Sequence, residues 1–142
     1  MNQNPQEGSI SPEWGVNITG ISNLPDKCPP HDVEEQEIVL YRLVAKNDKE
    51  ESFKNYVELF PERKNYFSIC AAYGLSFFDN ISAVKDLLDK NNNNGKAIAK
   101  VTIKKDYGVL TKKPSKKGHF TLWLYKNFNP NEVEFEIILN NG

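Results

Sequence analysis

Ile38-Val-Leu-Tyr-Arg-Leu-Val44 is an apolar run with one charged residue, Arg42, inside it. Successive side chains of a strand point to opposite faces, and apolar residues fall on both faces of this run. The run therefore predicts a central strand over 38–45 that is covered on both sides. Arg42 must then point into a covered face or a cleft, where an unpaired charge costs several kcal/mol. We expect its partner to be either a structural carboxylate or an anionic ligand.

The chain uses lysine almost everywhere for positive charge, and Arg42 and Arg63 are its only arginines. Lysine is a flexible point charge, whereas arginine is a planar fork that grips a carboxylate or a phosphate with two hydrogen bonds. Arg42 is therefore a candidate ligand-binding residue.

The periodicity of the remaining chain predicts more strands than helices. Apolar or alternating runs predict further strands at 74–78, 96–103, 107–110, 120–125 and 132–139. Helical spacing predicts short helices at 51–59 and at about 80–90, and 66–73 is either a short helix or a strand. Strands and helices do not alternate, so we expect an α+β fold with one mostly antiparallel or mixed sheet of about five to seven strands and two short helices.

The 142 residues suit a single domain with one sizeable core. Residues 1–32 are rich in proline and asparagine and predict an N-terminal arm, with one short edge strand at 14–18. Residues 33–142 are the predicted α+β domain.

Cysteine usage and the lack of long apolar stretches predict a reduced, cytoplasmic protein. Cys28 and Cys70 are too few for a disulfide framework and have no metal-ligand spacing, and Cys70 looks like an ordinary small core residue. No stretch approaches the roughly 18–20 apolar residues that cross a membrane, and the N-terminus lacks the features of a secretory signal. We therefore expect no metal site, no required cofactor and no membrane contact.

Charge is unevenly distributed, with an excess of acids up to residue 62 and an excess of bases after it. Either the two halves face each other in the fold, or the basic part attracts an anionic ligand or partner. The loop Lys112–Lys117 is the densest positive patch, and it is either a site for an anionic ligand or a solvated loop. The chain contains no nucleic-acid-binding module, P-loop or dinucleotide fingerprint, so we expect a protein partner rather than nucleic acid.

The last predicted strand carries Glu132, Glu134 and Glu136 on one face and apolar residues on the other. Like charges on one face repel each other, so we expect cations near them, supplied by Arg42 or by the lysine loop. The face is either solvated or contributes carboxylates to a cleft. Glu134 and Glu136 are the candidate catalytic residues.

Ser76 and His119 are further candidate site residues. Ser76 lies between the segment Gly74-Leu75 and two phenylalanines, and it binds either its own backbone or a ligand. Alternation puts His119, Thr121 and Trp123 on one strand face, which is either a pocket wall or an ordinary surface. No nucleophile motif surrounds the serine or the histidine, so we do not expect a Ser-His-Asp triad.

Four landmarks resemble those of a group of small bacterial proteins without an established activity. The resemblance covers roughly residues 38–125 and implies that Arg42, Ser76 and His119 belong to one pattern. The landmarks are Tyr41-Arg-Leu-Val44, Cys70-Ala-Ala-Tyr-Gly-Leu-Ser-Phe-Phe78, Ile98-Ala99 and His119-Phe-Thr-Leu-Trp123.

A second resemblance rests on the order of an arginine on a first strand, a serine before a helix, and Glu-x-Glu on a late strand. This order is similar to the Arg-Ser-Glu layout of ADP-ribosyltransferases. The resemblance implies that Arg42 contacts the phosphate or ribose of NAD and that Ser76 supports the nicotinamide ribose. Glu134 or Glu136 would bond the ribose 2′-hydroxyl and stabilise the oxocarbenium-like transition state.

Two functions of different classes are compatible with these features. The first is a non-catalytic binding module of the immunity, antitoxin or adaptor type from a bacterial or phage operon, in which Arg42 makes a structural salt bridge. The second is a small ADP-ribosyltransferase-like enzyme that cleaves its substrate NAD with Arg42, Ser76 and Glu134 or Glu136. Convergence of the arginine, the serine and a glutamate on one pocket would distinguish the second function from the first.

Overall fold

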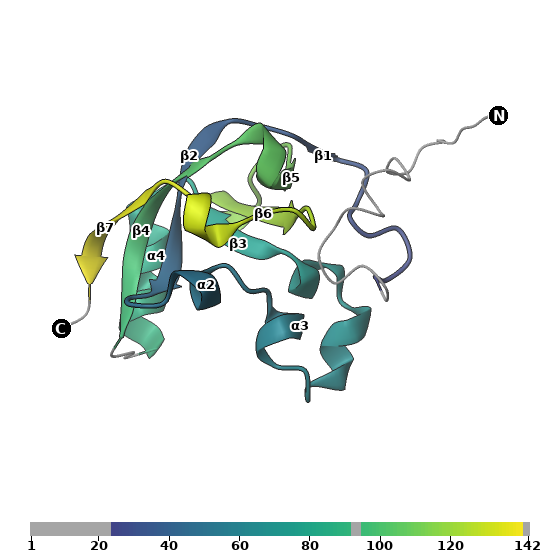
Figure 1. The fold of residues 1–142 in the computed structure, drawn as a ribbon, viewed down its shortest axis with the longest axis horizontal. Coiled ribbons are helices and arrows are strands. Elements are labelled where there is room, and N and C mark those ends of the chain that lie inside the picture. Colours follow the sequence, from purple (N-terminus) through teal and green to yellow (C-terminus); the bar gives the residue numbers. More distant parts are fainter. Residues whose placement is uncertain (1–23, 92–94, 141–142) are drawn as a thin grey trace.

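The computed structural model describes residues 24–91 and 95–140, which form one seven-stranded sheet with helices around it (Figure 1). The strands are β1 (Val33–Glu34), β2 (Ile38–Ala45), β3 (Leu75–Phe78), β4 (Lys96–Ile103), β5 (Gly108–Thr111), β6 (His119–Leu124) and β7 (Phe135–Asn140). The α-helices are α2 (Lys49–Ser52), α3 (Tyr56–Leu59) and α4 (Ile81–Asn91). Short 3-10 helices are η2 (Lys64–Ser68), η3 (Cys70–Tyr73), η4 (Lys105–Tyr107), η5 (Lys116–Gly118) and η6 (Pro130–Glu132). The strand predicted at 14–18 lies outside the described residues.

The sheet confirms the predicted α+β class. Its order is β1-β5-β6-β3-β2-β4-β7, and all neighbouring strands are antiparallel. β2 is a central strand, as its apolar run predicts, because it pairs with β4 at every position from Ile38 to Ala45 and buries Leu40 and Val44. None of the helices in the described part of the chain is both long and apolar enough to cross a bilayer.

The helix predicted over 51–59 is broken into α2 and α3. Asn55 starts α3 with a capping box, in which its side chain accepts from the Glu58 N–H and the Glu58 carboxylate accepts from the Asn55 N–H. A capping residue has an extended backbone and therefore cannot continue the preceding helix. The segment predicted as a short helix or strand at 66–73 is helical, and it consists of two 3-10 turns instead of one α-helix.

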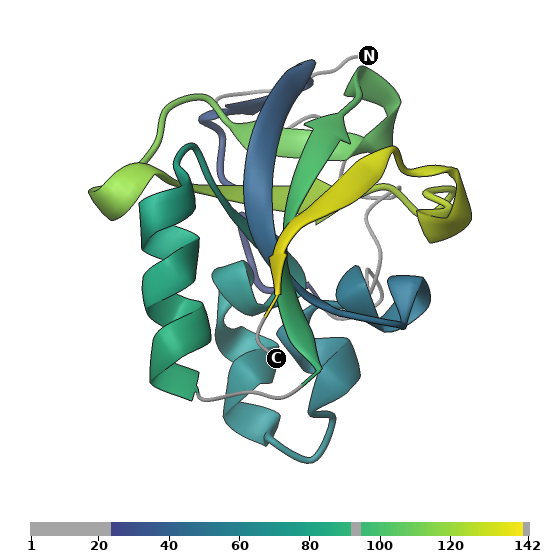
Figure 2. The same cartoon turned by 90° about the vertical axis from the view of Figure 1, so that its left-hand side faces the viewer.

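Apolar side chains cover both faces of the sheet. On one face, strand residues such as Leu40 and Phe77 pack with Phe53 from the connection between α2 and α3. On the other face, α4 packs Val84 and Leu88 against Ile98 of β4. Figure 2 shows α4 standing along that side of the sheet.

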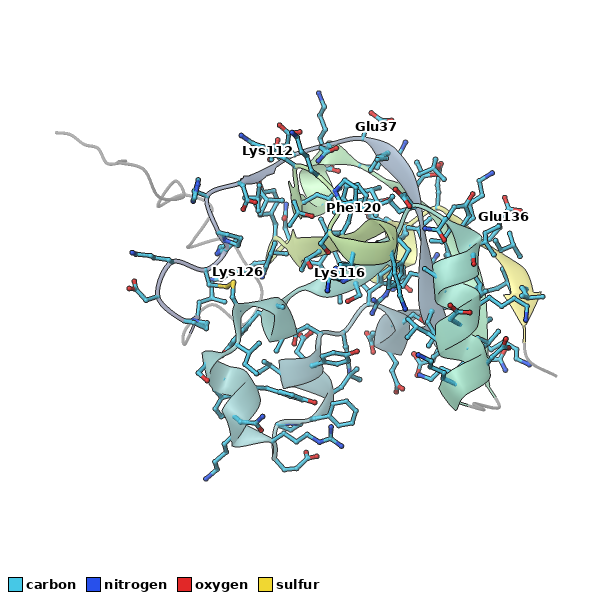
Figure 3. All side chains as sticks on the ribbon, turned by 180° about the vertical axis from the view of Figure 1, so that it is seen from behind. Glu37, Lys112, Lys116, Phe120, Lys126 and Glu136 are labelled. Carbon is cyan, nitrogen blue, oxygen red and sulfur yellow. A yellow bond between two sulfur atoms is a disulfide. The ribbon has the colours of Figure 1, made fainter. Side chains whose placement is uncertain are left out.

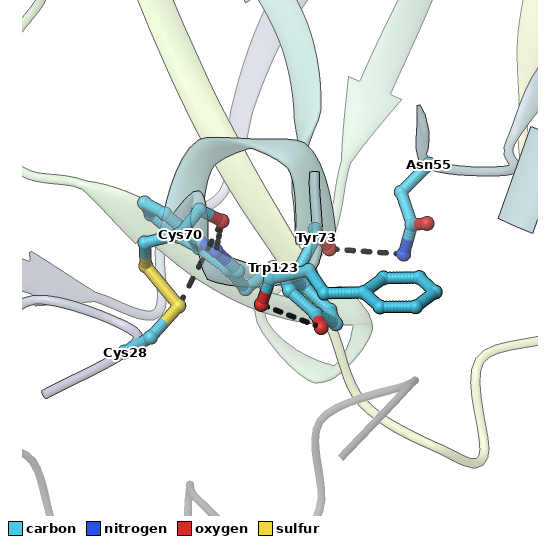
Figure 4. The surroundings of a disulfide bond; sticks show 6 residues. Cys28, Asn55, Cys70, Tyr73 and Trp123 are labelled. Atoms are coloured by element: carbon cyan, nitrogen blue, oxygen red, sulfur yellow. Dashed lines mark hydrogen bonds between the residues drawn. A yellow bond between two sulfur atoms is a disulfide. The ribbon is translucent and has the colours of Figure 1, made fainter. Parts of the chain in front are cut away.

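A disulfide joins Cys28 to Cys70 over a sequence separation of 42 residues (Figure 4). The expectation of reduced cysteines is therefore wrong. Cys28 packs with Tyr73 and Trp123 in a third apolar cluster, and the Trp123 indole N–H donates to the Cys70 carbonyl at 3.1 Å. The end of the predicted N-terminal arm is thus covalently tied to η3, a pairing that the spacing of two isolated cysteines does not reveal.

The last strand begins later than its alternation predicts. Pro130 opens the 3-10 turn η6, with Asn129 as its cap, and the strand starts only at Phe135. The predicted strand face with three glutamates is therefore wrong, because only Glu136 lies on β7.

Candidate functional site

β2 and β3 separate after a single paired position, and this split creates the candidate site. The pair is Tyr41 with Phe78, whereas β2 pairs with β4 along its whole length. Beyond the pair, residues 42–44 of β2 and 75–77 of β3 are not paired with each other. Backbone groups that face the gap therefore need other partners.

Arg42 crosses this gap. Its Nε donates to the Ser52 carbonyl at 2.9 Å and its Nη1 donates to the Ser76 carbonyl at 2.9 Å. The guanidinium carbon also lies 5.5 Å from the centroid of the Phe77 ring. A guanidinium has five N–H donors. Two of them bind backbone oxygens, and the other three have no partner among the described residues.

Arg42 has no carboxylate partner in the described part of the chain, so the expected structural salt bridge is not found there. One of the ion pairs in that part lies within α4, and the other joins Lys104 to Glu37. Burial lowers the pKa of the Arg42 guanidinium to about 10, although the nearby Tyr56 phenol acts to raise it. A partly buried cation with unused donors is well suited to bind an anion.

A pocket of about 470 Å3 opens at the split, and both Arg42 and Ser76 line it. Its volume lies within the range of small-molecule sites. Its other described charged residues are three cations and one acid, namely Lys54, Arg63, Lys96 and Glu51. None of the four cations forms an ion pair within residues 24–91 and 95–140. A concave site with this excess of positive charge favours anions.

Two buried polar residues, Ser52 and Asn55, hold the pocket floor in place. The Ser52 hydroxyl lies 3.0 Å from the Ala45 carbonyl and accepts from the Ala45 N–H at 3.0 Å. The Asn55 amide donates to the Tyr73 carbonyl at 3.1 Å (Figure 4). These bonds hold the connection between α2 and α3 against β2 and η3. They therefore also fix the position of the Ser52 carbonyl, which accepts a hydrogen bond from Arg42.

Three aromatic residues, Tyr56, Phe60 and Tyr66, form an aromatic wall of the pocket. Tyr56 stacks on Tyr66 with ring centroids 5.8 Å apart, and the Phe60 ring lies 6.2 Å from Tyr56. Arg63 lies 4.4 Å above the Phe60 ring and donates to the Tyr66 hydroxyl at 3.0 Å. Tyr56 is 52% exposed, so the wall presents aromatic surface to solvent.

Ser76 and His119 form a hydrogen-bonded pair, with 2.9 Å between Oγ and Nε2. The other ring nitrogen of His119 lies 3.3 Å from the Ser115 hydroxyl rather than from a carboxylate. A Ser-His-Asp triad needs a carboxylate at this nitrogen. The pair therefore does not form a triad. Ser76 binds Arg42 through its backbone carbonyl and His119 through its hydroxyl.

The titration of His119 makes the stability of the fold depend on pH. Burial lowers the pKa of His119. The unfolded chain then binds a proton more readily than the folded chain, so stability is lost as the pH falls below the unfolded value of about 6.5. We expect the free energy of unfolding to decrease between about pH 7.5 and about pH 5.5, and to decrease less in His119→Gln. Urea unfolding at both pH values measures this, and identical decreases in the two proteins would contradict it.

The predicted glutamates lie outside the pocket. Glu132 and Glu134 precede β7, and Glu136 lies opposite Lys100 of β4. β4 separates β7 from β2 in the sheet, and Figure 3 shows Glu136 at the β7 edge. The structure therefore brings together Arg42 and Ser76, but none of the three glutamates.

Thr121 and the loop Lys112–Lys117 also lie outside the pocket. Thr121 is buried and pairs with Ser76 across β3 and β6. The lysines of the loop are exposed, and Figure 3 shows Lys112 at the end of the molecule away from α3.

Sequence reasoning missed Arg63 and the aromatic wall. Tyr56 and Phe60 fit the helical spacing of the helix predicted over 51–59, which indicates a packed helix face rather than a pocket wall, and Arg63 and Tyr66 lie in the turns that follow. One signal was present, because Arg63 is the only other arginine of the chain. Both arginines line the same pocket.

Compared with known proteins, the chain matches no protein-family model, no curated protein and no solved structure. Among the residues that the structure describes, no group of three His, Cys, Asp or Glu side chains is placed to hold a metal ion. The function is therefore inferred from the pocket itself.

Proposed function

We propose that this protein is a non-catalytic binding module whose pocket at the β2–β3 split takes an anionic group. One observation carries the proposal. Arg42 is partly buried, hydrogen-bonds two carbonyl oxygens, and has no carboxylate partner in the described part of the chain. A charge that is withdrawn from water is usually paired in proteins. A bound anion supplies the missing pair.

The chemistry of the pocket favours phosphate or carboxylate. The unused donors of Arg42 belong to a planar fork that matches two oxygens of such a group. Lys54, Lys96 and Arg63 add positive charge to the same cavity. The pocket suits a small ligand, and the immunity, antitoxin or adaptor type of protein partner stays a prediction.

The ADP-ribosyltransferase alternative has less support. Its transition state needs a carboxylate beside the ribose. Glu134 and Glu136 lie outside the pocket, and Glu51 is its only described acid. Incubation of the protein with labelled NAD tests this alternative directly. We expect no release of nicotinamide, and release that disappears in Arg42→Lys would overturn the non-catalytic proposal.

Replacing Arg42 by lysine should weaken the binding of inorganic phosphate by about tenfold, which corresponds to about 1.4 kcal/mol. The charge is kept but the two-pronged geometry is lost, so the loss of affinity should exceed the loss of stability. Isothermal titration calorimetry and urea unfolding of the full chain measure the two quantities.

A variant of the basic loop, Lys112→Gln combined with Lys113→Gln, is the matched control because both lysines lie outside the pocket. We expect its affinity for phosphate to be unchanged. Equal losses of stability and affinity in Arg42→Lys would make Arg42 a structural residue. A loss in the loop variant would move the anion site to the loop.

A further inference from the structure

We propose that the pocket takes a small molecule that joins a phosphate to a planar aromatic ring. This inference rests on the proposed anion-binding function and names the class of ligand. Its basis is that the positively charged Arg42 lines the same cavity as the aromatic wall of Tyr56, Phe60 and Tyr66.

Tyr56 connects the two parts of the pocket. Its ring stacks on Tyr66, and Tyr56 lines the same pocket as Arg42. A ligand that binds the free donors of Arg42 with its phosphate therefore has aromatic side chains beside the remainder of the molecule.

The aromatic wall has surface available for stacking. Tyr56 is about half exposed, although a tyrosine normally contributes stability by burying its ring. Planar rings gain energy when they stack on aromatic side chains or on an arginine fork. The guanidinium carbon of Arg63 lies over the Phe60 ring, 4.4 Å from its centroid, and a hydrogen bond to the Tyr66 hydroxyl holds Arg63 beside the wall.

The volume of the pocket also favours a ligand larger than phosphate. A bare phosphate would occupy only a small part of about 470 Å3, and it would leave the aromatic wall in contact with water. Sites of this size normally enclose a ligand with an apolar body and a few polar groups. A phosphate at Arg42 and a ring at the aromatic wall would occupy both the cationic part and the aromatic part of the cavity.

Four probes test the ligand class by isothermal titration calorimetry with the full chain. They are adenosine monophosphate, O-phosphotyrosine, inorganic phosphate and adenosine. We expect adenosine monophosphate or O-phosphotyrosine to bind more tightly than inorganic phosphate, by a factor of about ten or greater. Adenosine should bind weakly. Comparison of the first two shows whether the ring is a nucleobase or a phenyl group.

Substitutions in the wall separate stacking from anion binding. Tyr66→Leu should weaken the binding of the ring-bearing phosphate about tenfold more than it weakens the binding of inorganic phosphate. Tyr66→Phe keeps the ring and should retain most of the affinity. Phe67→Leu is the matched control, because Phe67 is 41% exposed and does not line the pocket.

The outcomes distinguish this inference from the proposed function. Binding of inorganic phosphate that depends on Arg42, with no gain from a ring, would overturn the ligand class and leave the anion site standing. Absence of binding by every phosphate probe would overturn both. If Tyr66→Leu does not fold, saturation-transfer NMR on the unaltered protein decides, since a bound ring must receive magnetisation from the protein.

Discussion

Replacing both Cys28 and Cys70 by serine should lower the free energy of unfolding by about 4 kcal/mol. The disulfide closes a loop with a sequence separation of 42 residues. In the chain-entropy account, a cross-link stabilises the folded state by restricting the unfolded chain, and the effect grows with the length of the loop. Urea unfolding of the oxidised protein and of the double variant, at the same pH and salt, measures the difference.

Three controls belong to this experiment. Either single substitution breaks the same cross-link, so Cys28→Ser and Cys70→Ser should each lose about as much as the double variant. Reduction of the unaltered protein should have the same effect. Two reactive thiols in the native protein, or a double variant as stable as the original, would show that the cysteines are not paired in solution.

The disulfide is relevant to the cellular compartment of the protein. Disulfides persist in oxidising compartments and are rare in cytosolic proteins. Domains are typically stable by only about 5–15 kcal/mol, so a loss of about 4 kcal/mol would remove a large share of the stability in a reducing compartment. The predicted cytoplasmic location stays a prediction, and the stability of the reduced protein is the measurement that bears on it.

The sheet could be predicted because alternation is a local signal. β2 and β4 match their predicted ranges, and α4 differs from its predicted range by one residue at each end. The errors arose where a capping hydrogen bond, a proline turn or the disulfide outweighed the spacing of the apolar residues. Asn55 caps a new helix inside a continuous helical pattern, and Pro130 opens a turn inside a continuous strand pattern.

The candidate site could be predicted only in part. Arg42 stood out because a charge inside an apolar run is a local anomaly. Its contacts are not local, since its two carbonyl partners are 10 and 34 residues away in the sequence. The pocket draws on residues between Arg42 and Lys96, and only the separation of β2 from β3 brings them together. No periodic pattern reports such a separation.

Replacing Phe77 by alanine should lower the free energy of unfolding by about 3–5 kcal/mol. Phe77 is fully buried on β3, within the largest apolar cluster, so alanine would leave a cavity that the surrounding strands fill only partly. Phe67→Ala is the matched control, because it deletes the same atoms from a side chain that is 41% exposed. We expect the control to lose less than about 1 kcal/mol. Urea unfolding measures both changes.

Phe77→Leu tests how this core residue supports the pocket. Leucine keeps much of the apolar volume but removes the ring that lies 5.5 Å from the Arg42 guanidinium carbon. An arginine gains energy over an aromatic face, particularly where it is shielded from water. Phe77→Leu should therefore lose less stability than Phe77→Ala and still bind phosphate several-fold more weakly than the unaltered protein. Unchanged affinity for phosphate would mean that the two carbonyl oxygens alone orient Arg42, and that the ring serves only the core.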